Sequence, residues 1–380
     1  MPVLRVLLLS AVGARVNPYI DLLQQGLAAA GAEVRRTERL DPAGLDATRL
    51  DVVHLHWLER YDLPPAIAAP WPRGASGLPQ RAARRLWETA GNGAALYQVR
   101  RRQRLSRLLG QLQAFRSAGG RVVYTVHNLD PHEEPGPADR WAAGRLIGLA
   151  DAVHVHDAST AEALAGRYGR RMGVAVIPHG HYLDAYPNTI SRDEARRSLG
   201  LPPQAFVFVT LGLLRPYKRL EELLPAFKRV SKPDDVLLLA GKPEPDGYAQ
   251  TLAQLAGGDS RILLAPRFVP PDEVQTYLNA ADVCVLPYRQ ITTSGAALLA
   301  FSFGLPVIAP AIGAFRSLIA GRRGILYEPA DPGGLGRALE QARTTGWDGA
   351  REEITAWVAQ FDWAGIGRQF VELYTRTLAG

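Results

Sequence analysis

The sequence predicts an α/β protein built from two Rossmann-like domains, each containing a parallel, doubly wound sheet. Two observations carry this prediction. Short apolar runs, typical of buried strands, alternate with segments of helical periodicity along the chain. The chain also has 380 residues, which is too many for one small core. We therefore expect two such domains facing each other across a cleft that binds the ligand.

The composition is that of a globular protein from a reducing compartment. Apolar residues make up 47% of the chain and charged residues 21%. The single cysteine, Cys284, lies in an apolar run, so we expect a buried thiol and no disulfide framework. The first ten residues are too short and lack the basic start of a signal peptide. No run approaches the ~20 apolar residues of a membrane span. We expect a cytoplasmic protein.

The first half of the chain supplies the strands of an N-terminal domain. A strand over residues 4–10 leads to a helix that runs to about residue 30, with Asn17 as a cap and Pro18 in the first turn. Gly31 ends this helix, and a second strand follows it. Later apolar runs predict strands over residues 51–57, 121–126 and 152–156.

Polar side chains follow three of these strands where each one ends. The clusters are His54, His56, Trp57 and Glu59; His127 to Glu134; and His154, His156 and Asp157. Because the carboxyl ends of parallel strands line the binding crevice, we expect the clusters to lie together. A lone His in such a place is more often a hydrogen-bonded structural residue, which is our expectation for His54 and His154. A metal site is a weaker alternative, because the chain lacks an HExxH motif or a tight ligand pair.

A basic segment lies between the third and fourth expected strands. Residues 81–116 contain one acid, Glu88, and nine arginines, at positions 81, 84, 85, 100, 101, 102, 104, 107 and 116. One helical face is apolar and the arginines occupy the others; the apolar residues are Leu105, Leu108, Leu109, Leu112 and Phe115. Such a helix suits an anionic membrane surface, where each basic residue contributes about 1 kcal/mol. The alternative is a core-packed helix with a solvated basic face. Nucleic acid is a weaker choice, because no recognised motif accompanies the charge.

The second half of the chain repeats the alternation. A capping box of Ser191 and Glu194 predicts a helix that stops at Gly200. Strands are expected over residues 206–211, 235–240 and 261–264. Glycine and basic residues follow the first two of them: Gly212, Arg215 and Lys218, and then Lys242. An arginine fork and a lysine point charge can grip a diphosphate. The alternative is a pair of surface cations at a helix start, where the macrodipole disfavours them.

The stretch from Val283 to Pro306 organises this half. It predicts a buried strand over residues 283–286, a polar loop, and a helix from about Ser294 to Phe303. Thr292, Thr293 and Ser294 are good cap residues, and Gly295 lets a ligand approach the backbone. Free N–H groups at a helix start favour an anion such as a phosphate, although an ordinary capped helix is the alternative.

Farther on, Glu328 follows a short apolar run. It is placed to accept hydrogen bonds from ribose hydroxyls, or it is a solvent-facing acid.

Taken together, these stretches resemble the GT-B glycosyltransferases. More narrowly, they are similar to the xanthan-type, GDP-mannose-dependent β-mannosyltransferases that extend polyprenyl-diphosphate-linked oligosaccharides. The matching stretches keep their order as far as about Pro310; they are residues 17–19, 54–59, 125–134, 179–182, 214–218 and 286–295. Residues 64–97 and the C-terminal residues match only in outline.

The resemblance implies three parts: an acceptor-binding domain over residues 1–186, a nucleotide-sugar-binding domain over 187–355, and a helix over 356–380 that crosses back. It implies inverting transfer, with mannose from GDP-mannose as the best donor, to a lipid-linked oligosaccharide or related glycan in exopolysaccharide assembly. It implies no cofactor, no bound metal and no nucleic-acid partner. It also implies docking on the inner face of an anionic membrane. Retaining relatives carry two glutamates where this chain has Ile291 and Leu299, so retention by that arrangement is not expected.

The resemblance also assigns candidate residues. The donor set is Gly212, Arg215, Lys218, Lys242, Tyr288, Thr292, Thr293, Ser294, Gly295 and Glu328. The acceptor set is Asn17, His56, Trp57, His132, His181 and Tyr182. Inverting transfer needs a carboxylate that removes the acceptor's proton, and the candidates are Glu133, Glu59 and Asp157, with His127 nearby. Glu133 is preferred, because its loop extends past the strand end and histidines flank it; Glu59 is second.

Two other functions stay open. One is a retaining or natural-product sugar transferase that uses another nucleotide sugar. The other is a non-catalytic protein that binds a nucleotide sugar.

Overall fold

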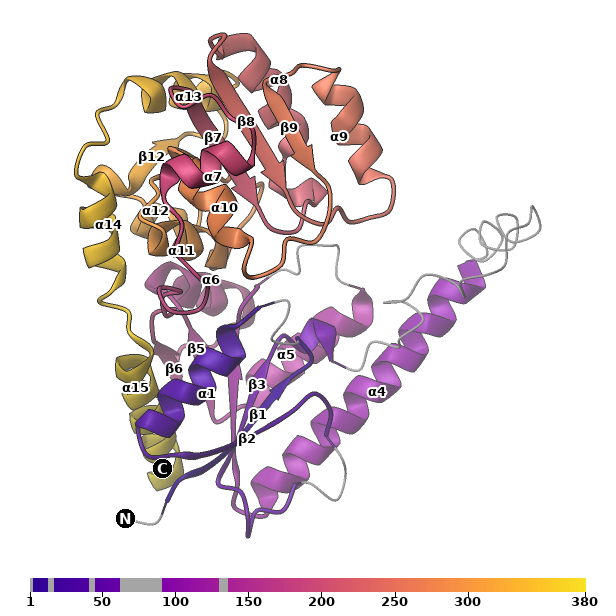
Figure 1. Cartoon of the computed structure of the whole chain (residues 1–380). Coiled ribbons are helices and arrows are strands. Elements are labelled where there is room, and N and C mark those ends of the chain that lie inside the picture. Colours follow the sequence, from indigo (N-terminus) through magenta and orange to yellow (C-terminus); the bar gives the residue numbers. More distant parts are fainter. Residues whose placement is uncertain (1–2, 13–16, 41–44, 62–90, 130–135) are drawn as a thin grey trace. The chain divides into compact units, whose positions relative to one another are not determined.

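The computed structural model describes residues 3–12, 17–40, 45–61, 91–129 and 136–380 (Figure 1). The chain divides into two compact units, residues 1–177 with 364–380, and residues 178–363. Each unit contains a six-stranded sheet whose neighbouring strands are parallel. The predicted class, two doubly wound α/β domains, is therefore confirmed.

The sheet of the first unit has the strand order β2-β1-β3-β4-β5-β6. Its strands are β1 (Arg5–Ser10), β2 (Glu33–Thr37), β3 (Val52–His56), β4 (Arg121–Thr125), β5 (Ala152–Val155) and β6 (Val174–Val176). Its helices are α1 (Tyr19–Ala29), α4 (Gly91–Ser117), α5 (Pro137–Leu149), α6 (Ala158–Tyr168) and α15 (Trp363–Ala379). Because β2 lies on one side of β1 and β3 on the other, the winding direction reverses between β1 and β3.

The core of the first unit joins the sheet to α4 and α5. The apolar face predicted for α4 is confirmed, since its five members are all at most 9% exposed: Leu105, Leu108, Leu109, Leu112 and Phe115. Burial of such a side chain stabilises the fold by roughly 1.5–3 kcal/mol. One arginine departs from the expected solvated faces, because Arg101 is only 1% exposed.

The sheet of the second unit has the order β12-β11-β10-β7-β8-β9. Its strands are β7 (Phe206–Leu211), β8 (Asp235–Ala240), β9 (Ile262–Ala265), β10 (Val283–Val285), β11 (Val307–Pro310) and β12 (Gly324–Tyr327). Its helices are α7 (Arg192–Ser198), α8 (Leu220–Val230), α9 (Tyr248–Ala256), α10 (Val274–Ala280), α11 (Gly295–Ser302), α12 (Phe315–Leu318), α13 (Gly334–Thr344) and α14 (Ala350–Val358). Here the winding direction reverses between β7 and β10.

A local signal fixed one helix start in this unit as predicted. The capping box is present at α7, where the Ser191 side chain accepts from the backbone N–H of Glu194 and the Glu194 side chain accepts from that of Ser191. Cys284 is a buried free thiol on β10, also as predicted.

The C-terminal helix α15 packs against α1 in the first unit (Figure 1). The two backbones come so close that a Cβ atom on Gly367 would lie 2.0 Å from the main-chain oxygen of Gly26. Only a residue without a side chain fits there, so Gly367 sets how closely the last helix joins the first unit.

We predict that Gly367→Ala destabilises the first unit by about 1–3 kcal/mol, because the added methyl group forces α15 away from α1. Hydrogen exchange should show loss of protection in both helices. Gly110→Ala is the matched control: this glycine lies inside α4 with open space around it, so alanine should be neutral or stabilising by ~0.5–1 kcal/mol. Equal protection in the Gly367 variant and the unaltered chain would contradict the proposed contact.

Candidate functional site

The loops after β7 and β10 lie where the winding direction of the second sheet reverses. β7 and β10 are hydrogen-bonded neighbours, with Cys284 opposite Val209. The loop after β7 passes Arg215 and enters a short 3-10 turn, Pro216–Lys218. In open parallel sheets, ligands bind outside such a reversal, at the carboxyl ends of the strands. The fold thus brings the predicted basic residues and the predicted helix start to one place.

Lys218 is a buried cation at this strand reversal. It is 4% exposed, and its Nζ lies 5.3 Å from the ring centroid of Tyr288. Among the described residues, no carboxylate forms an ion pair with it. Burial, and to a smaller extent the nearby Arg215, lower the pKa of Lys218 to about 8, while the Cys284 thiol acts in the opposite direction. A buried ammonium without an anion is costly, so an anionic ligand here would be stabilised.

Arg215 is held by an acid that sequence reasoning missed. Its Nε donates to Glu244 Oε2 at 3.0 Å, and its Nη2 donates to the same oxygen. Lys242 Nζ lies 3.4 Å from the other oxygen of Glu244. Partial burial opposes ionisation, but the hydrogen bonds and charges of Arg215 and Lys242 hold the pKa of Glu244 below its ordinary value. A diphosphate would therefore share Arg215 with Glu244 or displace that acid.

The start of α11 has the predicted cap. Ser294 Oγ accepts from the N–H of Ala297 at 3.1 Å. The Oγ1 atom of Thr293 is buried and makes no hydrogen bond to any described residue. The hydrogen-bonding capacity of that hydroxyl is therefore not used by any described residue. Thr292, one residue earlier, is partly exposed.

Residues 179–182 lie beside this helix start, within the second unit. A Cβ atom on Gly295 would lie 3.3 Å from Tyr182 Oη and 3.9 Å from His179 Nε2. His181 is half-buried, and its Nδ1 accepts from the N–H of Leu183 at 3.3 Å. Tyr182, predicted for the acceptor, thus neighbours Gly295, predicted for the donor.

Glu328 follows β12, the outermost strand of the second sheet. Its side chain is 67% exposed and lies 3.7 Å from Arg316 in an ion pair. No described contact joins it to Lys218 or Arg215.

A second group of predicted residues meets at the reversal of the first sheet. Tyr19, at the start of α1, packs edge-on against His56, Trp57 and His127, with ring centroids 5.7, 5.7 and 4.9 Å away. Asn17 Oδ1 accepts from the N–H of Tyr19 at 3.0 Å, which fixes this helix start. Trp57 stacks on His127 at 3.9 Å. The acceptor candidates His56 and Trp57 therefore share one aromatic wall, and Asn17 adjoins it through its hydrogen bond to Tyr19.

The buried histidines below this wall form a hydrogen-bonded chain. His54 Nε2 lies 2.6 Å from Thr125 Oγ1, and that oxygen lies 2.9 Å from His154 Nδ1. At one end of this hydrogen-bonded series, Tyr374 Oη lies 2.6 Å from His54 Nδ1. At the other end, the main-chain oxygen of Ile177 lies 2.8 Å from His154 Nε2. Burial lowers the pKa of His54 well below its usual range. His54 and His154 are therefore structural, as expected.

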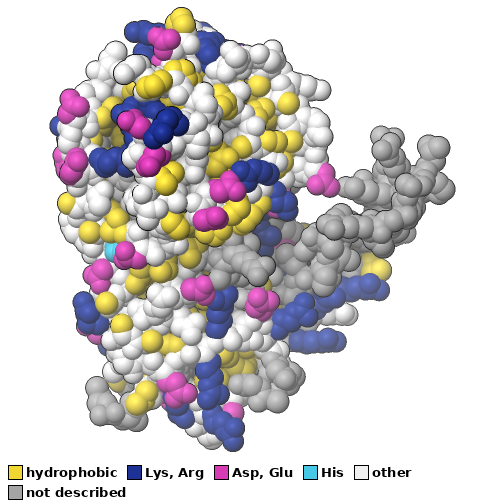
Figure 2. Space-filling view, in the orientation of Figure 1, with side chains coloured by type: hydrophobic (Ala, Val, Ile, Leu, Met, Phe, Trp, Pro, Cys, Tyr) yellow, Lys and Arg dark blue, Asp and Glu magenta, His cyan; other side chains and the backbone are white. Residues whose placement is uncertain are grey.

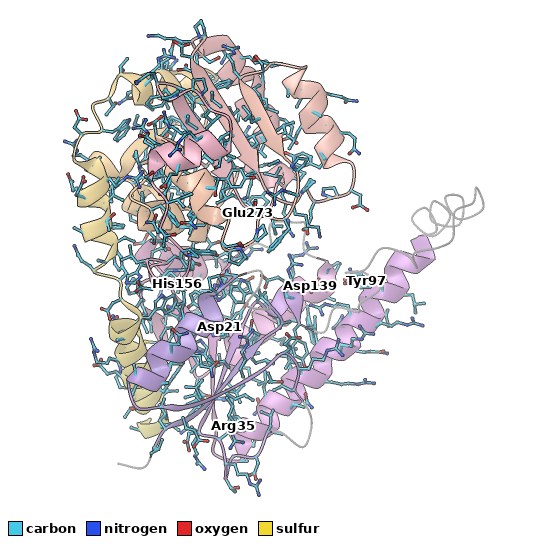
Figure 3. All side chains as sticks on the ribbon, viewed as in Figure 1. Asp21, Arg35, Tyr97, Asp139, His156 and Glu273 are labelled. Carbon is cyan, nitrogen blue, oxygen red and sulfur yellow. The ribbon has the colours of Figure 1, made fainter. Side chains whose placement is uncertain are left out.

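His56 differs from these two histidines. Its Nδ1 lies 3.0 Å from His127 Nε2, but its buried Nε2 makes no hydrogen bond to any described residue. Burial, with the charge of His127, holds the pKa of His56 well below its usual range, so it is a neutral group. His156, labelled in Figure 3, contacts the ring of His127 from the end of β5 at 5.4 Å.

Two of the candidate carboxylates fall within the described residues. Glu59 lies in the 3-10 turn Leu58–Arg60, is partly exposed, and accepts from Asn128 Nδ2 at 3.3 Å. Burial raises its pKa. Asp157 is the cap of α6, and its two oxygens accept from the N–H and the hydroxyl of Thr160 at 2.9 and 2.7 Å. Glu133 and His132 lie outside the described residues.

Within the part of the chain that the structure describes, no three His, Cys, Asp or Glu side chains are grouped to hold a metal ion. None of the described helices is long and apolar enough to cross a membrane.

Comparisons with known proteins identify the class. Residues 205–344 match the family described as Glycosyl transferases group 1. The fold is similar to sucrose-phosphate synthase of Thermosynechococcus elongatus, with a TM-score of 0.69 and 19% identity over 99% of each chain. It is also similar to Anabaena HepE in complex with UDP, with a TM-score of 0.70 and 16% identity over 98% of this chain and 100% of that one. The chain is a glycosyltransferase of the GT-B fold.

A curated relative makes the likeness more specific. The GDP-mannose:glycolipid 4-beta-D-mannosyltransferase of Xanthomonas campestris pv. campestris is 29% identical over 370 residues, which cover 96% of this chain and 90% of that protein. The D-inositol 3-phosphate glycosyltransferase of Corynebacterium urealyticum is 30% identical over 282 residues, 67% of this chain and 65% of that one. The predicted resemblance to the β-mannosyltransferases is confirmed.

We predict that GDP binds this chain less tightly as the pH rises through about 8, the value to which burial lowers the pKa of Lys218. A bound diphosphate favours the charged ammonium, so affinity is full below that pH and is lost above it. Lys218→Met should weaken binding at pH 7 by roughly 1.5–3 kcal/mol and remove the pH dependence. Titration calorimetry measures both effects. The exposed Lys232→Met is the control, and an unchanged pH dependence in Lys218→Met would assign it to another group.

Proposed function

We propose that this chain transfers mannose from GDP-mannose to a hydroxyl of a lipid-linked glycan, with inversion to a β linkage, in exopolysaccharide assembly. The observation that carries the proposal is the buried Lys218 ammonium, without an acidic partner among the described residues, at the strand reversal of a group 1 domain. The relative named as a GDP-mannose:glycolipid mannosyltransferase supports the donor and the acceptor class, because the similarity runs over 96% of this chain.

In the proposed reaction, the acceptor oxygen attacks C1 of mannose as a carboxylate removes its proton. The C1–O bond to the diphosphate breaks on the opposite face, and its electron pair leaves with GDP. Lys218, Arg215 and the N–H groups at the start of α11 stabilise the charge on the leaving group, without a metal ion. Inversion is favoured because the two positions that carry glutamates in retaining relatives hold Ile291 and Leu299, which cannot ionise.

The acceptor class suggests where the protein works. The first described turns of α4 expose Leu96 and Val99, each at least half exposed, next to the exposed Arg100. Figure 2 shows Lys and Arg side chains gathered along the outward part of this helix. Apolar side chains among arginines suit the interface of an anionic bilayer. We propose that α4 docks the enzyme on the inner face of the membrane that holds its acceptor.

Among nucleoside diphosphates, GDP should stabilise the chain most against heat, by about 2.7 kcal/mol at a hundred times its dissociation constant. With a panel of short-chain glycolipid acceptors in excess EDTA, GDP-mannose should yield a β-mannoside, identified by the anomeric signals in NMR. UDP-glucose is the matched donor control. An α-mannoside would contradict inversion. Loss of activity in EDTA, restored by Mg²⁺ or Mn²⁺, would contradict metal-free transfer. GDP release without sugar transfer to any acceptor would contradict the proposed function.

Replacing Arg100, Arg102 and Arg107 with Gln should reduce sedimentation with anionic vesicles, because exposed charges attract the surface and salt screens them. Arg101 is left unchanged because it is buried. The control removes the same charge from Arg35, Arg49 and Arg337, whose side chains are 63%, 80% and 64% exposed. Equal sedimentation of the two triple variants would leave α4 as a core-packed helix with a solvated face.

A further inference from the structure

Arg101 is buried on a helix whose neighbouring arginines are exposed. Its side chain is 0% exposed, while Arg100 and Arg102 on either side of it lie at the surface. A guanidinium removed from water is tolerated only where its N–H groups are hydrogen-bonded and its charge is paired. The partners of Arg101 therefore show what the residue is there to hold.

Those partners belong to the short turn that follows β3. Nη2 of Arg101 donates to the main-chain oxygens of Leu58 and Glu59, each at 3.2 Å, and Nη1 donates to that of Tyr61. Nε donates to Asp139 Oδ1 on α5 at 3.0 Å, which pairs the charge. Asp139 is labelled on α5 in Figure 3. One side chain of α4 thus holds three of the four carbonyl groups between residues 58 and 61, and its pair with Asp139 ties them to α5 as well.

The turn carries Glu59, the carboxylate beside the aromatic wall. It starts from Trp57, whose φ of 49° is a left-handed conformation that costs free energy for a residue other than glycine. A turn with such a start needs outside contacts to keep one shape. Asn128, just after β4, orients one oxygen of Glu59 at 3.3 Å. Asp157, by contrast, uses both of its oxygens to cap α6.

We propose that Glu59 is the base that removes the acceptor's proton and that Arg101 is the positioning residue that holds it in place. This inference rests on the proposed function. In the step, the hydroxyl proton passes to Glu59 Oε, the acceptor oxygen forms its bond to C1, and GDP leaves with the electron pair of the broken bond. Arg101 touches no reacting atom and acts through the turn.

The surroundings of Glu59 suit a base. The titratable groups that act on the carboxyl are Arg60 of its own turn, Tyr124 of β4 and Asp139 of α5, while Arg101 of α4 donates to the main-chain oxygen of Glu59. Burial raises the pKa of Glu59, which strengthens the carboxylate as a proton acceptor. Activity should therefore fall as the pH drops through this raised pKa. Loosening the turn would rehydrate the carboxylate and move that acid limb to lower pH.

The test uses the full chain, GDP-mannose and a short-chain glycolipid that the unaltered chain mannosylates. Glu59→Gln should lower kcat by ~10²–10⁴-fold, the usual contribution of a general base, and leave GDP affinity unchanged. Arg101→Lys keeps the positive charge but loses the guanidinium N–H groups that bind the turn, so kcat should fall by up to about 10²-fold. The acid limb of the pH profile of kcat should move to lower pH, and the donor KM should stay unchanged. In the Glu59→Gln background, Arg101→Lys should have no further effect.

The matched control is Arg116→Lys, because Arg116 also lies on α4 and pairs with an acid, Asp151 at 2.8 Å, but contacts no part of the turn. Its kcat should stay unchanged. Circular dichroism checks that each variant is folded at the assay temperature. Should Arg101→Lys be unfolded, Asp139→Asn takes its place in the cycle, because it removes the charge partner that orients the guanidinium of Arg101. The kcat should then fall in the same direction but by less, and an unchanged kcat would contradict the positioning role.

Several results would overturn the inference while the proposed function stands. Near-normal kcat in Glu59→Gln, with loss in Glu133→Gln or Asp157→Asn instead, would pass the role of base to that residue. If the losses in kcat of Glu59→Gln and Arg101→Lys multiplied in the double variant, Arg101 would act independently of Glu59, as a general contact of the fold. The same conclusion would follow if Arg101→Lys lowered the unfolding temperature but left kcat and its pH profile unchanged. If the unaltered chain transferred no mannose to any acceptor, the proposed function would fail, and this inference with it.

Discussion

A parallel sheet brings the carboxyl ends of its strands to one edge, and a reversal of the winding direction separates two neighbouring loops at that edge. Both sheets of this protein have such a reversal, between β1 and β3 and between β7 and β10. Several of the candidate site residues lie on the four loops that follow these strands. Lys218 and Ser294 follow β7 and β10, and Tyr19 and Trp57 follow β1 and β3. The backbone topology therefore fixes the candidate sites before any side chain is considered.

Much of this arrangement could be predicted because its signals are local. The strands are apolar runs, Ser294 and Ser191 are caps that act within three residues, and the core face of α4 repeats every three or four residues. The alternation of strands and helices then implies parallel sheets, and their carboxyl ends imply where ligands bind. The cap role of Asp157 also had a local signal, since Asp before a helix favours that position.

The parts of the candidate site that could not be predicted depend on contacts between residues that are distant in the sequence. Glu244 meets Arg215 across neighbouring strand ends, and Asn128 meets Glu59 in the same way, so neither pair leaves a local pattern. Arg101 is an intermediate case. It stands four residues before Leu105 and seven before Leu108, on the face that is buried, so periodicity alone marks it as different from Arg100 and Arg102. What periodicity cannot supply is the set of carbonyl groups that accept from it.

Three buried cations differ in whether the fold itself provides a partner for their charge. Arg101 and Arg196 are each 1% exposed, and each is matched by backbone carbonyls and one aspartate, Asp139 or Asp282. Lys218 is buried almost as deeply, yet no described acid pairs with it and its pKa falls to about 8. Desolvation opposes all three charges, but only the two arginines are compensated within the fold. The uncompensated lysine lies at the strand reversal where a diphosphate is expected. Its desolvation already destabilises the folded chain, so a bound diphosphate gains the attraction of the ammonium without a further cost of desolvating it.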